Sequence, residues 1–119
     1  MNENGMIVYS SKYGATRQYA EWLAEELHLP LHETENVSAE QLAYADYLLI
    51  GTPIFYGSFM IRKWLRKNVL AIRNKKLFLF IVTATSADEV DTRKKFMRHN
   101  IPSEIRQDFE FFFLPGRLI

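Results

Sequence analysis

The stretch Ser10-Ser11-Lys12-Tyr13-Gly14-Ala15-Thr16-Arg17 decides how the rest of the chain is interpreted. It follows the apolar run Met6-Ile7-Val8-Tyr9, and a helical pattern begins directly after it, so we predict a short turn from strand to helix. The N–H groups at a helix start lack partners within the helix and carry partial positive charge. Three hydroxyl side chains and a glycine therefore predict a site for a phosphate-sized anion, although an ordinary capped helix start would show a similar pattern.

The composition indicates one globular domain that spans residues 1–119. Hydrophobic residues make up 48% of the chain and charged residues 24%, as in ordinary folded domains. Cysteine is absent, which excludes disulfides, thiolate metal sites and cysteine nucleophiles. The histidines at 28, 32 and 99 are too scattered for us to expect a metal site. No basic and apolar leader opens the chain, and no apolar run reaches the length of a membrane span, so we expect a cytoplasmic protein.

Strands and helices are expected to alternate along the chain. Continuous apolar runs predict buried strands, and apolar residues at helical spacing predict the helices between them. The strands are expected at residues 6–10, 29–33, 46–51, 76–82 and 109–114. The helices are expected at residues 15–28, 59–72 and 88–99, with a short one after Ser38, which forms a capping box with Gln41. Such alternation predicts an α/β fold with a doubly wound, five-stranded parallel sheet.

The predicted sheet has a face that is not completely covered. A doubly wound sheet of five strands normally has a closing helix after its last strand, and the sequence stops at Ile119, just after that strand. An apolar strip of the sheet would then be uncovered. We expect a partner or a second copy in a homodimer to cover it, unless the native chain is truncated here and continues beyond residue 119.

Three loops are expected at one edge of this sheet, at residues 10–16, 52–58 and 83–86. Ligands of open α/β sheets bind at the carboxyl ends of the strands, where these loops lie. All three loops are rich in small and hydroxyl residues, and the middle one carries Phe55 and Tyr56. The combination favours a ligand that is phosphorylated, planar and aromatic.

At these loops the sequence resembles the flavodoxin family. The phosphate loop of that family, S/T-x-x-G-x-T, is similar to Ser11-Lys12-Tyr13-Gly14-Ala15-Thr16, and Ile50-Gly51-Thr52-Pro53-Ile54-Phe55-Tyr56-Gly57 looks like its first flavin-flanking loop. Val82-Thr83-Ala84-Thr85-Ser86 takes the place of the second, without the usual glycines. The Gly14-Ala15-Thr16-Arg17 and Ile54-Phe55-Tyr56-Gly57 runs look most like the branch of menaquinone-dependent protoporphyrinogen oxidases. The resemblance implies the strand order 2-1-3-4-5 and FMN bound without a covalent link.

The resemblance also implies which residues hold FMN and which chemistry follows. The phosphate would lie on Ser10, Ser11, Tyr13, Gly14, Ala15 and Thr16. The isoalloxazine ring would lie between Thr52, Pro53, Ile54, Phe55, Tyr56 and Gly57 on one side and Thr83, Ala84, Thr85 and Ser86 on the other. No catalytic side chain is expected, because the chemistry belongs to the flavin. Three functions stay open: an FMN-dependent oxidoreductase, an electron carrier that is not an enzyme, and a flavin-free interaction module.

Two basic groups stand out although the net charge is only +1. They are residues Arg62, Lys63, Arg66, Lys67, Arg73, Lys75 and Lys76, and residues Arg93, Lys94, Lys95 and Arg98. They are either solvated helix faces or a docking surface for an acidic partner or anionic lipid, and their helices should lie on the same side of the sheet. The expected partners are a redox protein or a quinone, with peripheral membrane contact through Arg62, Lys63, Arg66 and Lys67.

Overall fold

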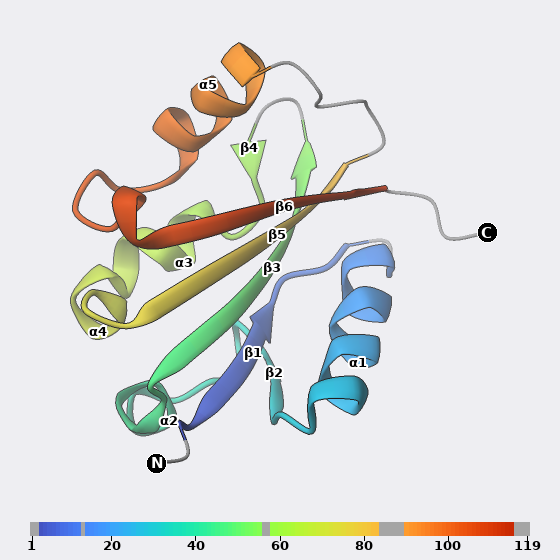
Figure 1. The fold of residues 1–119 in the computed structure, drawn as a ribbon, viewed down its shortest axis with the longest axis vertical. Helices are drawn as coiled ribbons and strands as arrows, with labels where there is room; N and C mark the ends of the chain where they lie inside the picture. The colour runs from blue at the N-terminus through green and yellow to red at the C-terminus, as the bar shows by residue number, and fades with distance from the viewer. Residues whose placement is uncertain (1–2, 13, 56–57, 84–89, 116–119) are drawn as a thin grey trace.

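The computed structural model describes residues 3–12, 14–55, 58–83 and 90–115, and Figure 1 shows how their strands and helices alternate. The strands are β1 (Gly5–Tyr9), β2 (Leu31–Glu33), β3 (Tyr47–Phe55), β4 (Ser58–Phe59), β5 (Lys76–Thr83) and β6 (Phe109–Pro115). The helices are α1 (Ala15–Leu27), α2 (Ala39–Tyr44), α3 (Arg62–Lys67), α4 (Val69–Ile72) and α5 (Val90–Asn100), with a 3-10 turn η1 (Arg106–Asp108).

The long strands form one parallel sheet in the order β2-β1-β3-β5-β6, and the short β4 pairs antiparallel with β3. When the five parallel strands are numbered consecutively this is the order 2-1-3-4-5, so the predicted α/β fold and topology are confirmed. The order reverses at β1, because the chain first adds β2 on one side and then β3 on the other. Such a reversal separates the loops that follow neighbouring strands and opens a crevice between them.

The helices cover the two faces of the sheet unequally. On one face, α2 to α5 pack against the strands in a large core that includes Val8, Ile50 and Leu79. On the other face, α1 packs over Ile7, Tyr9 and other residues of the central strands, and it is the only helix there within the described ranges. Alternate residues of each strand therefore point into different cores, which is why the strands are apolar on both faces.

The predicted uncovered strip lies on the α1 side of β5 and β6. Phe112 is 51% exposed there, and Phe78 is half-buried. Beside the C-terminal end of α1 an open groove of about 840 Å³ is lined by residues that include Leu27, Tyr47 and Phe78. The partner or second copy that would cover this strip stays a prediction.

The segment after residue 51 differs from the expected loop and helix. Residues 52–55 continue β3, and the chain then turns back into β4, so Phe59 belongs to a strand and the helix begins only at Arg62. The backbone N–H of Met60 donates to the Pro53 carbonyl at 3.1 Å, which holds the returning segment on β3. Phe59 and Ile61 are both buried, and this two-residue spacing of buried side chains is the period of a strand.

The expected helix over residues 59–72 is also interrupted near its end. The backbone N–H and the side-chain Nδ2 of Asn68 both donate to the Trp64 carbonyl, each at 3.0 Å, and so end α3. The Asn68 carbonyl in turn accepts the N–H groups of Ala71 and Ile72 in α4. A short polar side chain competes with helical hydrogen bonding in this way, and the apolar spacing does not show it.

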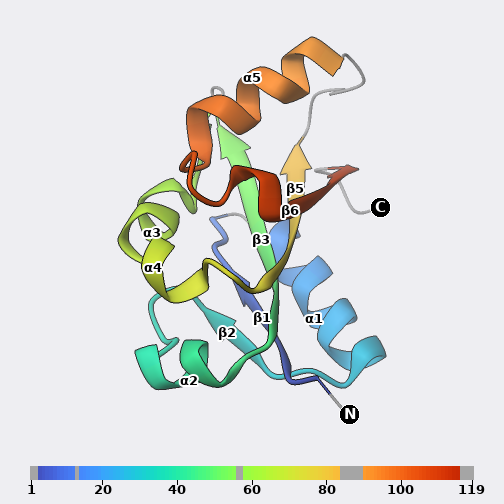
Figure 2. The same ribbon diagram turned by 60° about the vertical axis from the view of Figure 1, so that its left-hand side comes forward.

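Other expectations agree with the structure. The capping box of α2 is present, with the Ser38 hydroxyl accepting the Gln41 N–H at 3.1 Å and the Gln41 side chain accepting the Ser38 N–H at 2.8 Å. Helices α3 and α5 lie on the same side of the sheet, as expected (Figure 2). Within the described ranges, none of the helices has the length and apolar character needed to cross a bilayer.

Candidate functional site

The sheet topology brings the ends of β1, β3 and β5 side by side. Tyr9, the last residue of β1, pairs with Gly51 of β3, and Pro53 of β3 pairs with Val82 of β5. Because the three strands are parallel, their carboxyl ends lie at the same end of the sheet (Figure 2). The three predicted loop regions therefore start next to one another, as a binding site at a topological switch point requires.

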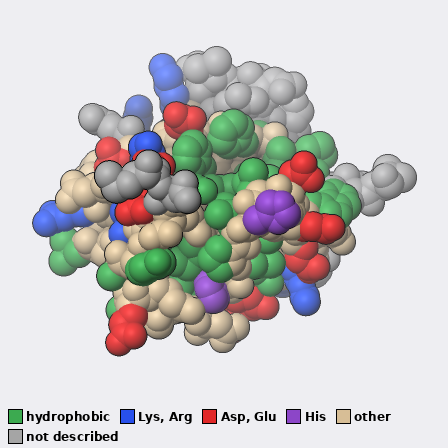
Figure 3. Space-filling view, turned by 60° about the horizontal axis from the view of Figure 1, so that its bottom comes forward, with side chains coloured by type: hydrophobic (Ala, Val, Ile, Leu, Met, Phe, Trp, Pro, Cys, Tyr) green, Lys and Arg blue, Asp and Glu red, His purple; other side chains and the backbone are tan. Residues whose placement is uncertain are grey.

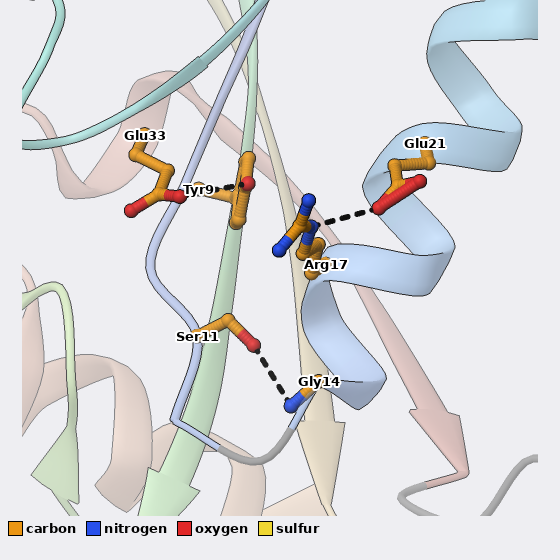
Figure 4. A network of polar contacts seen from close by, with 6 residues as sticks. All are labelled: Tyr9, Ser11, Gly14, Arg17, Glu21 and Glu33. Carbon is orange, nitrogen blue, oxygen red and sulfur yellow. Dashed lines mark hydrogen bonds and ion pairs between the residues drawn. The ribbon is translucent and has the colours of Figure 1, made fainter.

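The turn before α1 has the geometry of an anion site. Gly14 has a φ of 94°, a left-handed conformation that glycine adopts without strain. Its N–H donates to the Ser11 hydroxyl oxygen at 3.2 Å, which closes the turn in front of the helix (Figure 4). Apart from its chain neighbours, a Cβ atom built on Gly14 would meet no atom within 4 Å, so the space beside Gly14 at the start of α1 is open. A side chain at this position would fill that space.

The hydrogen-bond donors around this space differ in whether they already have acceptors within the protein. The first N–H groups of α1 have no acceptor within the helix. Thr16 is only 1% exposed, and its hydroxyl makes no hydrogen bond to another described residue. Ser10 is more occupied, because its N–H donates to the Gly51 carbonyl at 3.0 Å and its hydroxyl lies 3.3 Å from that of Thr34. We therefore expect the N–H groups of the first turn, Ser11 and Thr16 to be the main anion donors.

The second predicted region is a strand and a tight hairpin in place of an open loop. Thr52 is completely buried, and its hydroxyl donates to the Pro53 carbonyl at 2.9 Å and accepts the Ile61 N–H at 3.1 Å. It therefore fixes the hairpin. Pro53 is buried, and Ile54 packs against the core on the α3 side. Phe55 pairs with Ser58 through the backbone. The predicted ring-contact residues Tyr56 and Gly57 lie outside the described residues.

The remaining predicted residues are only partly described. Ala15 is the first residue of α1 and is half-buried against the α1-side core. Thr83 is the last residue of β5 and is buried at the same sheet edge. Tyr13, Ala84, Thr85 and Ser86 lie outside the described residues, so their role in the site stays a prediction.

A polar network beside the turn was not predicted as part of the site. The Tyr9 hydroxyl donates to Glu33 at 3.3 Å, and Arg17 pairs with Glu21 at 2.9 Å (Figure 4). Burial, together with the negative charge of Glu33 and the hydrogen bond to it, raises the pKa of Tyr9. The hydrogen bond to Glu21 raises the pKa of Arg17. The four-residue spacing of Arg17 and Glu21 could have revealed their pair from sequence, whereas Tyr9 and Glu33 meet only through the register of β1 and β2.

A separate hollow lies at the other end of the sheet. It has a volume of about 560 Å³ and is lined by residues around the start of β1, including His28, His32, Glu40 and Tyr44. Figure 3 looks onto this end of the molecule and shows histidine and acidic side chains among hydrophobic ones. In the described part of the chain no three His, Asp or Glu side chains are placed to hold a metal ion. The hollow lies at the opposite end of β1 from the turn before α1.

Comparisons with known proteins agree with this arrangement. A flavodoxin from the domain Archaea has 15% identity and a TM-score of 0.61, covering 96% of this chain and 85% of that one. A flavodoxin, WrbA-like protein from Agrobacterium tumefaciens has 23% identity and a TM-score of 0.66, covering 83% and 69%. The two-electron reduced flavodoxin of Megasphaera elsdenii has 16% identity and a TM-score of 0.63, covering 96% and 87%. No match is found among curated proteins.

These structural neighbours share the fold at low sequence identity. The family comparison reaches further, because the profile of the flavodoxin domain matches residues 6–119 and so includes the anion turn, the hairpin and all five parallel strands. The chain belongs to the flavodoxin domain family.

Proposed function

We propose that this protein binds FMN without a covalent link and transfers electrons through it. The observation that carries the proposal is the open space before α1, where Gly14 leaves room for a phosphate in front of unpaired backbone donors. Membership of the flavodoxin domain family and the reduced state of the Megasphaera elsdenii neighbour support the same cofactor.

The residues present fit the phosphate of FMN. A phosphate carries negative charge and several acceptor oxygens, and the start of α1 offers N–H donors with the positive end of the helix dipole. Ser11 still has its hydroxyl proton to donate, because it uses only its oxygen to accept the Gly14 N–H. Thr16 is held at the helix start by burial, so its hydroxyl is placed without a further loss of side-chain freedom.

The other residues of the site would position the flavin ring. When bound, FMN supplies the electron chemistry, and the protein supplies orientation and electrostatics. Thr52 holds the β3–β4 hairpin against the start of α3 and thereby fixes the position of the hairpin at the end of the sheet. Stacking of the ring between residues 52–58 and 83–86 belongs to this proposal.

The identity of the electron acceptor is a finer part of the proposal. The narrower resemblance to menaquinone-dependent protoporphyrinogen oxidases suggests an enzyme that works with a quinone or a porphyrinogen. An electron carrier would instead be reduced by a reductase without turning over either compound. Turnover assays with a menaquinone analogue and a porphyrinogen separate these two hypotheses.

Absorbance and titration test the cofactor itself. The purified protein should absorb at about 450 nm, or the colourless protein should take up FMN with that absorbance. Thr16→Val keeps the shape of the side chain and removes one donor, so FMN affinity should fall about tenfold or more. Riboflavin, which lacks the phosphate, serves as the matched control and should bind parent and variant alike. A protein that takes up no FMN would refute the proposal and favour the flavin-free module.

A further inference from the structure

The charges of this protein are distributed very unequally over its fold. Helices α3 and α5 contain eight of the 15 Lys and Arg residues of the chain but only one of its 14 Asp and Glu residues. These two helices therefore carry a formal charge of +7, and the rest of the chain carries −6. The net charge of +1 hides this separation. A separation of this size orients an approaching charged molecule and speeds its association.

The fold places the two basic helices together. Both lie on the face of the sheet opposite α1, and their apolar residues Leu65 and Met97 belong to the same core (Figures 1 and 2). The side chains of Arg62 in α3 and His99 in α5 approach to 3.5 Å. We call the exposed cations of these helices the basic surface. It consists of Lys63, Arg66, Lys67, Lys94, Lys95 and Arg98.

The cations of the basic surface are not neutralised within the described structure. The ion pairs there are Arg17 with Glu21 and Lys76 with Glu3, and both lie outside α3 and α5. Arg106 shows the contrast, because it donates to the Arg98 and Ile101 carbonyls at 3.1 and 2.9 Å and so caps α5. Like charges three or four residues apart destabilise a helix. Of these cations, only Arg66, Lys67 and Arg98, in the last turns of α3 and α5, gain a favourable interaction with the helix dipole.

The basic surface is joined to the edge of the sheet that carries the candidate site. Asn100 at the end of α5 is buried, and its side-chain oxygen accepts the Phe59 N–H of β4 at 2.8 Å. Strand β4 is the returning arm of the hairpin that follows β3 at that edge. A molecule held on α3 and α5 would therefore lie beside the hairpin predicted to flank the flavin ring.

We propose that the basic surface docks an acidic electron-transfer protein. Membrane insertion would use several large apolar side chains exposed among the cations. None of those described within α3 and α5 is exposed, which leaves only Met60 and Leu70 beside α3. Met60 and Leu70, which are exposed in the segments on either side of α3, suit a protein interface that mixes Arg with Met and other apolar residues. In the reaction served by docking, a reduced one-electron centre of the partner, such as the cluster of the ferredoxin used below as the probe, loses one electron, and the bound flavin gains it. Only this last step rests on the proposed function.

The test uses an acidic plant-type [2Fe–2S] ferredoxin as the probe and the full chain loaded with FMN. Lys67→Gln combined with Lys94→Gln removes two charges from the basic surface. Arg73→Gln combined with Lys76→Gln removes two exposed charges before and at the start of β5, and it is the matched control. At low salt the first variant should associate with the ferredoxin about tenfold more slowly and be reduced by it about tenfold more slowly. In the control variant both rates should change less than about twofold. The difference should disappear at about 0.3 M salt.

Several results would overturn the proposal. Equal effects of the two variants, or ferredoxin binding that does not depend on salt, would remove the role of the basic surface. Binding to vesicles with about 30% phosphatidylserine, lost in the first variant, together with no binding of ferredoxin, would replace the protein partner by a membrane. Calorimetry can also detect ferredoxin binding to a protein that takes up no FMN. That result would support the docking surface and refute the FMN proposal. A failure of the docking proposal can therefore be told apart from a failure of the FMN proposal.

Discussion

Replacing Gly14 gives the sharpest test of the anion turn. In Gly14→Ala the new Cβ meets no atom within 4 Å other than those of its chain neighbours, so the substitution causes no clash with the rest of the described protein. Its cost comes from the φ of 94°, which an alanine adopts at about 1–2 kcal/mol. For a domain of this size, that loss lowers the Tm by roughly 4–8 °C. Gly14→Asn should cost less, because asparagine tolerates the left-handed region better than alanine.

The effect on FMN should not follow the effect on stability. In both variants the side chain fills the space that we assign to the phosphate, so one or two charge-assisted hydrogen bonds of about 1.5–3 kcal/mol each are lost. FMN affinity should therefore fall at least about tenfold in Gly14→Ala and in Gly14→Asn, although their Tm values differ.

Fluorescence titration of FMN, with thermal unfolding in parallel, measures both quantities. Riboflavin is the control, and its affinity should stay within about twofold of that of the parent because it has no phosphate. Inorganic phosphate should compete with FMN in the parent protein only. Parent-like FMN affinity in both variants would show that the phosphate does not lie at Gly14. An equal loss of FMN and riboflavin would point to general damage of the fold.

Three further predictions concern the sheet. Gly51→Ala places a Cβ against the Phe80 ring, so it should cost about 1–3 kcal/mol of unfolding free energy in urea, and an unchanged midpoint would contradict this packing. The pKa of Tyr9 is raised because burial and Glu33 favour the neutral phenol. The stability that this group contributes is therefore fully present below its pKa in the unfolded chain, about 10. It is lost as the pH rises through the higher pKa of the folded protein. Tyr9→Phe should remove this loss of stability at alkaline pH. Unfolding curves measured between about pH 8 and 11, the range around the tyrosine pKa, test this. Identical pH profiles of the parent and the variant would argue against it. Phe112→Lys should leave the fold intact and dissociate the expected homodimer in sedimentation velocity, whereas a parent that is monomeric at every concentration would refute that homodimer.

The turn before α1 was predictable from the sequence because its signals are local. Gly14, Ser11 and Thr16 lie within six residues, and the change from strand to helix period between them is visible in the chain itself. The hairpin after β3 was not predictable in this way. Thr52 looked like a ligand residue because it follows an apolar run, but its hydroxyl is used by Pro53 and Ile61. Only the tertiary structure shows which polar groups the fold itself has already paired.

The sequence by itself determined the alternation of strands and helices along the chain, the turn between β1 and α1 and the helix cap at Ser38. These depend on periods, glycine conformation and hydroxyl groups that act over a few residues. The tertiary structure decided the return of β4 onto β3, the break at Asn68 and the pairing of Tyr9 with Glu33. It also brought α3 and α5 together into one basic surface. Such contacts join residues that are distant in the chain, and their geometry follows from strand register and core packing, which no local pattern encodes.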